Sequence, residues 1–156
     1  MELPGFFTNG LVTRDIYAPD ILFKDPIHSR TLCRSRTTYL LGAETLRWTM
    51  ALRYQALAFE ILQIHPASLE PGTPEASLLQ STSGLAREGL RIRWSLEAMP
   101  RGAIWKSEVA VSYEGLFLYA FNTEGLVKEH ILEKIHPLPP PLISCLLGRR
   151  IAFPAL

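Results

Sequence analysis

Residues 90–136 hold three strand-like segments in direct succession, separated only by short turns. The first, 90–98 ("LRIRWSLEA"), alternates between apolar and polar residues, which is typical of a strand with one buried face. Its apolar side is formed by Leu90, Ile92, Trp94 and Leu96. Successive strands joined by turns predict an antiparallel sheet.

The next two segments form the expected hairpin. Residues 104–121 are long for one strand, and Gly115 indicates a bulge or bend within them. The sequence "NTEG" at 122–125 predicts a tight turn with a positive φ at Gly125, and residues 126–136 predict the returning strand. Long strands with a glycine bend indicate a strongly curved sheet, and a helix packed in the curve would enclose an apolar interior.

The N-terminal half contributes a strand, a helix and a second strand. The segment "YAPDILFKDP" (17–26) predicts a strand that ends at the proline, because the residue before a proline is held extended. Residues 27–41 are polar and basic, and we expect a loop. Residues 42–59 fit both a helical stripe and a strand alternation, and their content of good helix formers favours the helix. Residues 59–65 predict a strand that stops at Pro66.

A chain of 156 residues suits one domain with a core of its own. We expect this domain to span residues 1–136. Residues 66–87, rich in proline, glycine, serine and threonine, indicate a long insertion loop, and residues 137–156 indicate a Pro-rich, apolar tail.

Composition excludes several classes of partner. The net charge of +1 argues against nucleic acid. No stretch approaches the ~20 apolar residues of a membrane span. The two cysteines show no metal-binding spacing, so we expect no metal and a reducing intracellular compartment. The sequence has no glycine-rich phosphate loop, and we expect no cofactor.

Four short motifs carry a resemblance to a known family. They are "FKDP" from residue 23, "IRWSL" from 92, "PRGAIW" from 100 and "EGLVKEH" from 124. In this order they resemble the nuclear transport factor 2-like (SnoaL and ketosteroid isomerase-like) superfamily over roughly residues 15–136. Within it, the chain is most similar to an uncharacterised family of plants, algae and fungi. The resemblance implies an α+β cone, in which a curved, mainly antiparallel sheet wraps around helices and leaves a pocket at the open end.

The resemblance also bears on the acid in "FKDP". In ketosteroid isomerases the aspartate before this proline is the general base, which places Asp25 at that position. Their oxyanion acid would fall near Phe117, and the tyrosine of their first helix has no counterpart in residues 1–16. Two other roles for Asp25 are a structural one, accepting N–H bonds from the following loop, and a polar contact with a ligand.

The incomplete catalytic set favours a non-catalytic module that binds a small hydrophobic molecule or a protein partner, as an accessory subunit in an organelle such as a mitochondrion or plastid. The alternative is a SnoaL-type isomerase or cyclase-like enzyme acting on a small hydrophobic carbonyl compound with Asp25 as base. A homodimer is expected through the open face of the sheet, because residues 104–121 carry more large side chains than one inner face can hide. The expected pocket residues are Tyr17, Phe23, Trp48, Trp94, Trp105, Phe117 and Tyr119.

Overall fold

The computed structural model describes residues 5–11, 13–25, 30–79, 85–102 and 110–137. Its elements, in chain order, are α1 (Phe6–Asn9), the 3-10 helix η2 (Arg14–Ile16), β1 (Tyr17–Asp25), β2 (Arg30–Cys33), α2 (Arg36–Arg53), β3 (Tyr54–Ser68), α3 (Pro74–Ser77), β4 (Leu85–Pro100), β5 (Val111–Asn122) and β6 (Val127–His136). In this part of the chain the strands form one six-stranded sheet.

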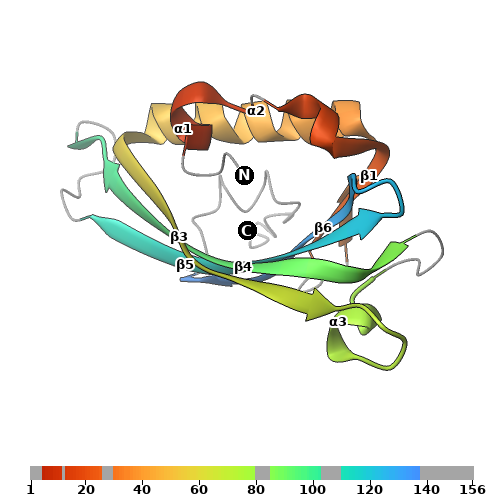
Figure 1. Cartoon of the computed structure of the whole chain (residues 1–156). Helices are drawn as coiled ribbons and strands as arrows, with labels where there is room; N and C mark the ends of the chain where they lie inside the picture. The colour runs from red at the N-terminus through yellow and green to blue at the C-terminus, as the bar shows by residue number, and fades with distance from the viewer. Residues whose placement is uncertain (1–4, 12, 26–29, 80–84, 103–109, 138–156) are drawn as a thin grey trace, which may run out of the picture.

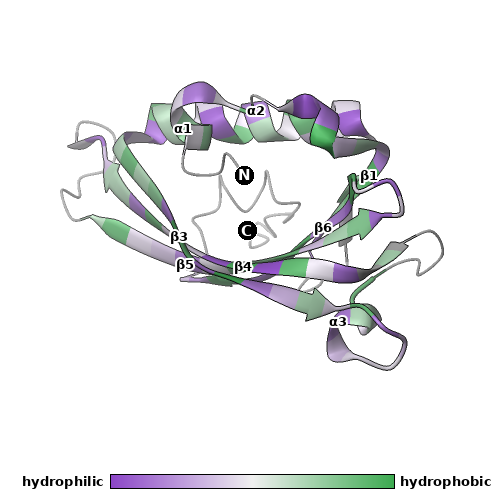
Figure 2. Ribbon diagram, in the orientation of Figure 1, coloured by the Kyte–Doolittle hydropathy of each residue, from purple (hydrophilic) through white to green (hydrophobic). Residues whose placement is uncertain are grey.

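The sheet has the order β2-β1-β6-β5-β4-β3 and is mainly antiparallel. Only the pair β1 and β6 runs parallel among these neighbours. Figure 1 shows a curved sheet with α1 and α2 across its concave side and α3 on the convex side. The predicted α+β architecture is confirmed, and Figure 2 shows hydrophobic and hydrophilic residues alternating along the strands.

The helix predicted for 42–59 exists but is displaced toward the N-terminus. It begins at Arg36, after Ser35, whose side chain accepts a hydrogen bond from the Thr38 N–H at 3.2 Å. Such a serine cap satisfies one of the free N–H groups of the first turn. The loop expected over 27–41 is therefore wrong from residue 30 onward, where β2 and the first turn of α2 lie. The helix ends at Arg53 because the following residues pair with β4 instead.

The strand after α2 is longer than expected. It continues through Pro66 to Ser68, so the prediction that the proline stops it is wrong. β3 is an edge strand of the sheet, where a residue without an N–H is tolerated. The predicted insertion is correspondingly shorter and contains α3, while its residues 80–84 lie outside the described part.

The hairpin of β5 and β6 agrees with the sequence where the chain is described. Gly125 has φ 82°, and the Asn122 side chain accepts hydrogen bonds from the N–H groups of Glu124 and Leu126. At Gly115 a Cβ would lie 2.1 Å from the Trp94 ring, so glycine is required for that ring to cross β5. The β5–β6 register shifts one residue later.

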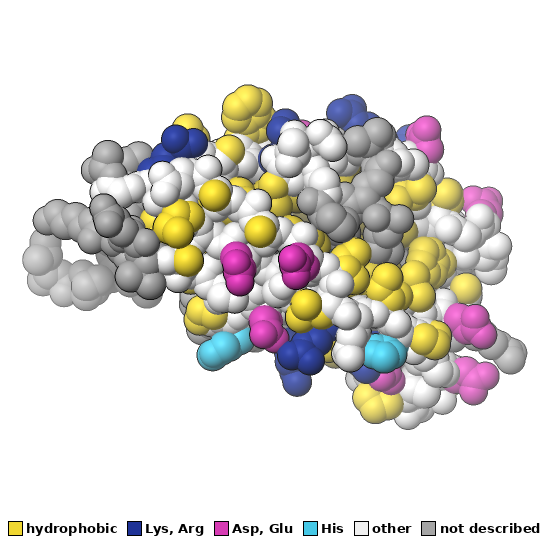
Figure 3. Space-filling view, turned by 60° about the vertical axis from the view of Figure 1, so that its left-hand side comes forward, with side chains coloured by type: hydrophobic (Ala, Val, Ile, Leu, Met, Phe, Trp, Pro, Cys, Tyr) yellow, Lys and Arg dark blue, Asp and Glu magenta, His cyan; other side chains and the backbone are white. Residues whose placement is uncertain are grey.

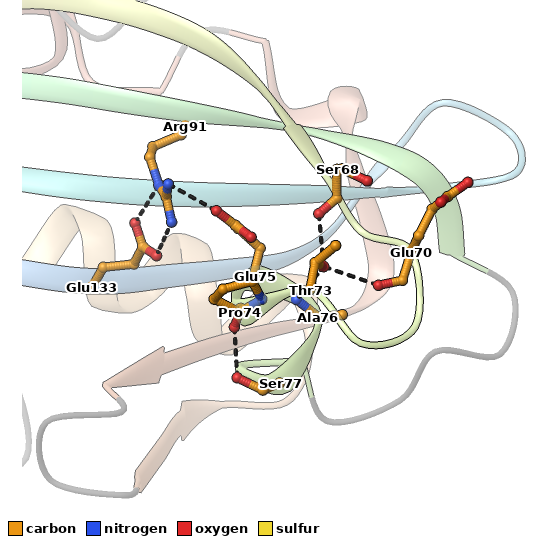
Figure 4. A network of polar contacts seen from close by, with 9 residues as sticks. All are labelled: Ser68, Glu70, Thr73, Pro74, Glu75, Ala76, Ser77, Arg91 and Glu133. Atoms are coloured by element: carbon orange, nitrogen blue, oxygen red, sulfur yellow. Dashed lines mark hydrogen bonds and ion pairs between the residues drawn. The ribbon is translucent and has the colours of Figure 1, made fainter.

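The convex face is partly covered by the insertion. Leu118, Ala120 and Ile131 pack there under the α3 segment. Figure 4 shows the polar link that holds the segment: the Arg91 guanidinium donates to Glu133 at 2.8 and 2.9 Å and pairs with Glu75 of α3 at 2.9 Å. Part of the apolar surface that motivated the homodimer prediction is thus buried within one chain, and the homodimer stays a prediction.

Candidate functional site

A cavity of about 540 Å³ lies between the helices and the concave face of the sheet. Helices α1 and α2 contribute Phe7, Leu46 and Met50 to its walls, and the strands contribute Phe59, Trp94 and Leu132. The described residues that line it include no Asp, Glu, Lys or Arg. The curvature of the sheet produces this space because the inward side chains of its central strands do not fill it.

A row of aromatic rings forms the floor of the cavity. Phe59 stacks on Trp94 with their centroids 5.5 Å apart, and Trp94 stacks on Phe117 at 5.1 Å. Phe117 meets the His130 imidazole edge-on at 4.6 Å. Since each of these residues comes from a neighbouring strand, the row crosses β3, β4, β5 and β6.

His130 is the polar member of this floor. It is only 6% exposed, and Tyr119 stacks on it at 4.3 Å. Its Nδ1 lies 2.8 Å from the hydroxyl oxygen of Tyr39, which comes from α2, so this hydrogen bond joins the helix to the sheet. Burial lowers the pKa of His130 to about 3 and raises the pKa of Tyr39 well above its ordinary value. Both side chains are therefore neutral at pH 7.

Two other polar groups of the lining are also uncharged. The Tyr113 hydroxyl lies 3.3 Å from that of Tyr54, and burial raises the pKa of Tyr113. Cys33, the last residue of β2, is half-buried, and burial raises the pKa of its thiol. The site therefore presents hydrogen-bonding groups without formal charge.

Only some of the seven predicted pocket residues line the cavity. Phe23, Trp94 and Phe117 line the cavity. Tyr17 and Tyr119 are buried beside it in the core, with 6% and 2% exposed, and are not part of its lining.

The remaining two predicted pocket residues lie elsewhere. Trp48 is 62% exposed on α2, outside the cavity, so the prediction that it lines the pocket is wrong. The space-filling view shows hydrophobic and basic side chains at the surface along the upper edge of the molecule, where α2 lies (Figure 3). Trp105 lies outside the described residues.

Asp25 is not part of the cavity lining. It is 3% exposed at the end of β1, and its Cα is paired with that of Arg30 on β2. A general base must lie within hydrogen-bond reach of the proton that it removes. The position that the ketosteroid isomerase resemblance assigns to Asp25 is therefore not supported by this geometry.

Sequence reasoning missed Tyr39 and His130. Tyr39 falls in the segment expected to be a loop, and the Ser35 cap was the signal that could have moved the helix start. His130 belongs to a strand in which residues on both faces are buried, so alternation gave no sign of its importance. Their contact joins positions 91 residues apart and follows from the tertiary fold alone.

Two further features concern metals and membranes. The described residues contain no group of three or more His, Cys, Asp or Glu side chains arranged to hold a metal ion. No helix in the described ranges has the length and apolar character needed to cross a bilayer.

Comparison with known sequences gives relatives that are themselves described as uncharacterised. The family "Uncharacterized conserved protein (DUF2358)" matches residues 1–71. The "Uncharacterized protein C6orf136 homolog" of Bos taurus is 26% identical over 167 residues, which cover 97% of this chain and 45% of that protein. The chain thus spans less than half the length of this relative.

Comparison with solved structures identifies the fold. An NTF2-like protein of unknown function from Exiguobacterium sp. 255-15 matches with a TM-score of 0.54 and 8% identity, covering 84% of this chain and 89% of that chain. A hypothetical protein with a ketosteroid isomerase-like fold from Catenulispora acidiphila DSM 44928 was solved in complex with trimethylamine. It matches with a TM-score of 0.50 and 9% identity, covering 84% of this chain and 80% of that chain. The protein Aln2 from a Streptomyces species matches with a TM-score of 0.50 and 6% identity, covering 85% of this chain and 80% of that chain. The curved sheet, the helices on its concave side and the similarity to these solved structures agree. The chain has the nuclear transport factor 2-like fold that its sequence motifs resemble.

Proposed function

We propose that the protein is a non-catalytic module that binds a small hydrophobic molecule in the cavity of its cone. The observation that carries this proposal is a space of about 540 Å³ with aromatic and aliphatic walls. Small-molecule sites typically have volumes of about 300–1,000 Å³ and apolar walls with a few placed polar groups. Burial of apolar ligand surface would supply most of the binding free energy.

Two observations support binding over catalysis. Asp25, the base of the alternative isomerase or cyclase hypothesis, is not part of the cavity lining. His130 does line the cavity, but a pKa of about 3 makes its imidazole a weak proton acceptor at neutral pH. Effective general bases have a pKa near the working pH. The polar groups of this site are therefore suited to hydrogen bonding with a ligand.

We also propose three more specific features of the function. They are a role as an accessory subunit, a setting in a mitochondrion or plastid, and a protein partner. Native mass spectrometry of the full chain purified from its own cells tests the accessory role and the protein partner, and purification from an isolated organelle tests the setting. A copurified small molecule supports the ligand-binding role, and a copurified partner chain supports the accessory role.

A direct test of the cavity uses the neutral fluorophore N-phenyl-1-naphthylamine and the variant Gly42→Leu. Gly42 lines the cavity, and the nearest atom to a Cβ placed there is the Cys33 Sγ at 3.8 Å. A Cβ therefore fits there without strain, and we expect the leucine side chain to narrow the cavity and to favour the helix. The matched control is Leu52→Ala, since Leu52 lies on the same helix, is 70% exposed and is outside the lining.

We expect saturable binding with one site per chain in the wild type and in Leu52→Ala. The affinity of Gly42→Leu should fall at least about tenfold, equivalent to ~1.4 kcal/mol, while its melting temperature is kept. Absence of saturable binding in the wild type, or equal affinity in all three proteins, would refute the proposed function.

A further inference from the structure

One polar atom in the lining residues of the cavity has no role in the fold described so far. The Nε2 of His130 is buried and has no hydrogen-bond partner among the described residues. Buried polar atoms are nearly always paired, so an unpaired one beside a cavity indicates a partner supplied by water or by a ligand. The other ring nitrogen is already bonded to Tyr39.

What Nε2 offers depends on the direction of the hydrogen bond between Nδ1 and Tyr39. A neutral imidazole carries one proton, and a phenol carries one that it can donate. When the Tyr39 hydroxyl donates to Nδ1, the imidazole proton must reside on Nε2. Nε2 is then a hydrogen-bond donor, held in place by a bond between α2 and β6. Its natural partner is an oxygen with a free lone pair.

A second buried donor, the Nε1–H of Trp94, differs in its position. It also has no partner among the described residues. However, a Cβ at Gly115 would lie only 2.8 Å from this nitrogen, so Nε1 rests against the backbone of β5. This makes His130, and not Trp94, the better-placed donor for a ligand inside the cavity.

The lining also limits the charge of the ligand. No Lys or Arg among the described residues lines the cavity to neutralise an anion, and no Asp or Glu lines it to neutralise a cation. Burying an unpaired ion in an apolar site is strongly unfavourable. The ligand is therefore expected to be uncharged.

We propose that the ligand is an uncharged, largely hydrophobic molecule whose carbonyl oxygen accepts a hydrogen bond from the Nε2–H of His130, with Tyr39 as a positioning residue. This inference rests on the proposed function, because it assumes that the cavity binds a ligand. It adds the chemical class of the ligand and the residue that selects it.

The test compares three probes of similar shape: the ketone 2-acetylnaphthalene, its hydrocarbon counterpart 2-isopropenylnaphthalene, and the anion 2-naphthoate. Binding is measured by fluorescence titration on the full-length wild type, His130→Phe and Trp94→Phe. The measured quantity is the preference for ketone over hydrocarbon within each protein, which cancels general changes in cavity shape.

We expect the wild type to bind the ketone about fivefold more tightly than the hydrocarbon, the range of one net hydrogen bond. The anion should bind more weakly than either. The preference should disappear in His130→Phe and persist in Trp94→Phe. Hydrocarbon binding without ketone preference in the wild type would overturn this inference and leave the proposed function standing. Failure of both neutral probes would overturn both.

A second measurement does not depend on variants. Nitrogen-15 NMR of the histidine rings reports which nitrogen carries the proton. We expect the Nε2–H tautomer for His130, and a downfield shift of that proton when 2-acetylnaphthalene is added. An Nδ1–H tautomer, or an Nε2 proton that does not respond to the ketone, would refute the assignment. The role of Tyr39 as a positioning residue is tested separately by titration: in Tyr39→Phe the preference for ketone over hydrocarbon should fall, because the imidazole loses the hydrogen bond that orients it.

Discussion

The buried imidazole of His130 should make the protein sensitive to mild acid. Its pKa is about 3 in the folded chain and about 6.5 when exposed. Between pH 6.5 and pH 3 the unfolded state therefore binds a proton that the folded state does not bind. The free energy of unfolding that His130 contributes above pH 6.5 is lost as the pH falls toward 3. Since each pH unit in this window is worth about 1.4 kcal/mol, lowering the pH from 7 to 5 should reduce the free energy of unfolding by about 2 kcal/mol.

The groups around the imidazole do not offset this loss. Tyr39 and Tyr119 face it from α2 and β5, and burial raises the pKa of both, so they stay protonated throughout the window. Cys33, whose pKa is also raised, is likewise neutral. No carboxylate lines the cavity within the described residues to stabilise an imidazolium.

The assay is urea unfolding at pH 7, 6 and 5 for the wild type and His130→Gln. Glutamine keeps a polar group for Tyr39 and does not titrate. Titration of the carboxylates and of the other histidines affects both proteins alike, so the difference between the two pH profiles isolates His130. We expect the wild type to lose about 2 kcal/mol more than the variant between pH 7 and pH 5. Parallel profiles would show that the histidine titrates in the fold as it does in the unfolded chain, and that our account of its burial is wrong.

Three further substitutions test other parts of the fold by urea unfolding and thermal melting. Asp25→Asn should lower stability by ~1 kcal/mol through loss of charge-assisted hydrogen bonds and leave probe binding intact; loss of binding with unchanged stability would support a polar contact between Asp25 and the ligand instead. Lys24→Met should cost about 3–5 kcal/mol, because Lys24 and Glu129 form a buried ion pair at 2.6 Å and the variant removes the cation of that pair. Adding Glu129→Leu should recover most of that loss, and a single variant as stable as the wild type would contradict this. Gly115→Ala should cost about 1–3 kcal/mol, since its Cβ would overlap the Trp94 ring; a neutral result would mean that the ring moves freely.

The sheet was largely predictable from the sequence because its signals are local. The alternation in β4 involves residues only two positions apart. The turn after Asn122 depends on Gly125, which has a positive φ. The start of α2 was missed because Ser35 sits in a polar, basic stretch that resembles a loop. The prediction that Pro66 ends its strand was wrong. A proline is tolerated within β3 because this strand lies at the edge of the sheet, and only the topology determines that position.

The site was less predictable than the fold. Phe23, Trp94 and Phe117 could be chosen because large aromatic residues on an inner face have few other places to go. The same logic predicts Trp48, which is instead exposed, because the residues that a helix turns toward the core depend on where the helix begins. The bond between Tyr39 and His130 has no local signal at all, since its two halves meet only when α2 closes over β6.

The burial of β6 on both of its faces has a consequence for how the chain tolerates change. From Glu129 to Leu132 four consecutive residues are buried, with His130 toward the cavity and Ile131 under the insertion. A slip of one residue in the pairing of this strand reverses the face of every side chain. It would place the Glu129 carboxylate among aromatic rings and the imidazole against aliphatic side chains. An insertion or deletion of a single residue between the Gly125 turn and His130 is therefore expected to abolish folding, whereas the same change in the 69–79 segment is accommodated on the outside of the sheet.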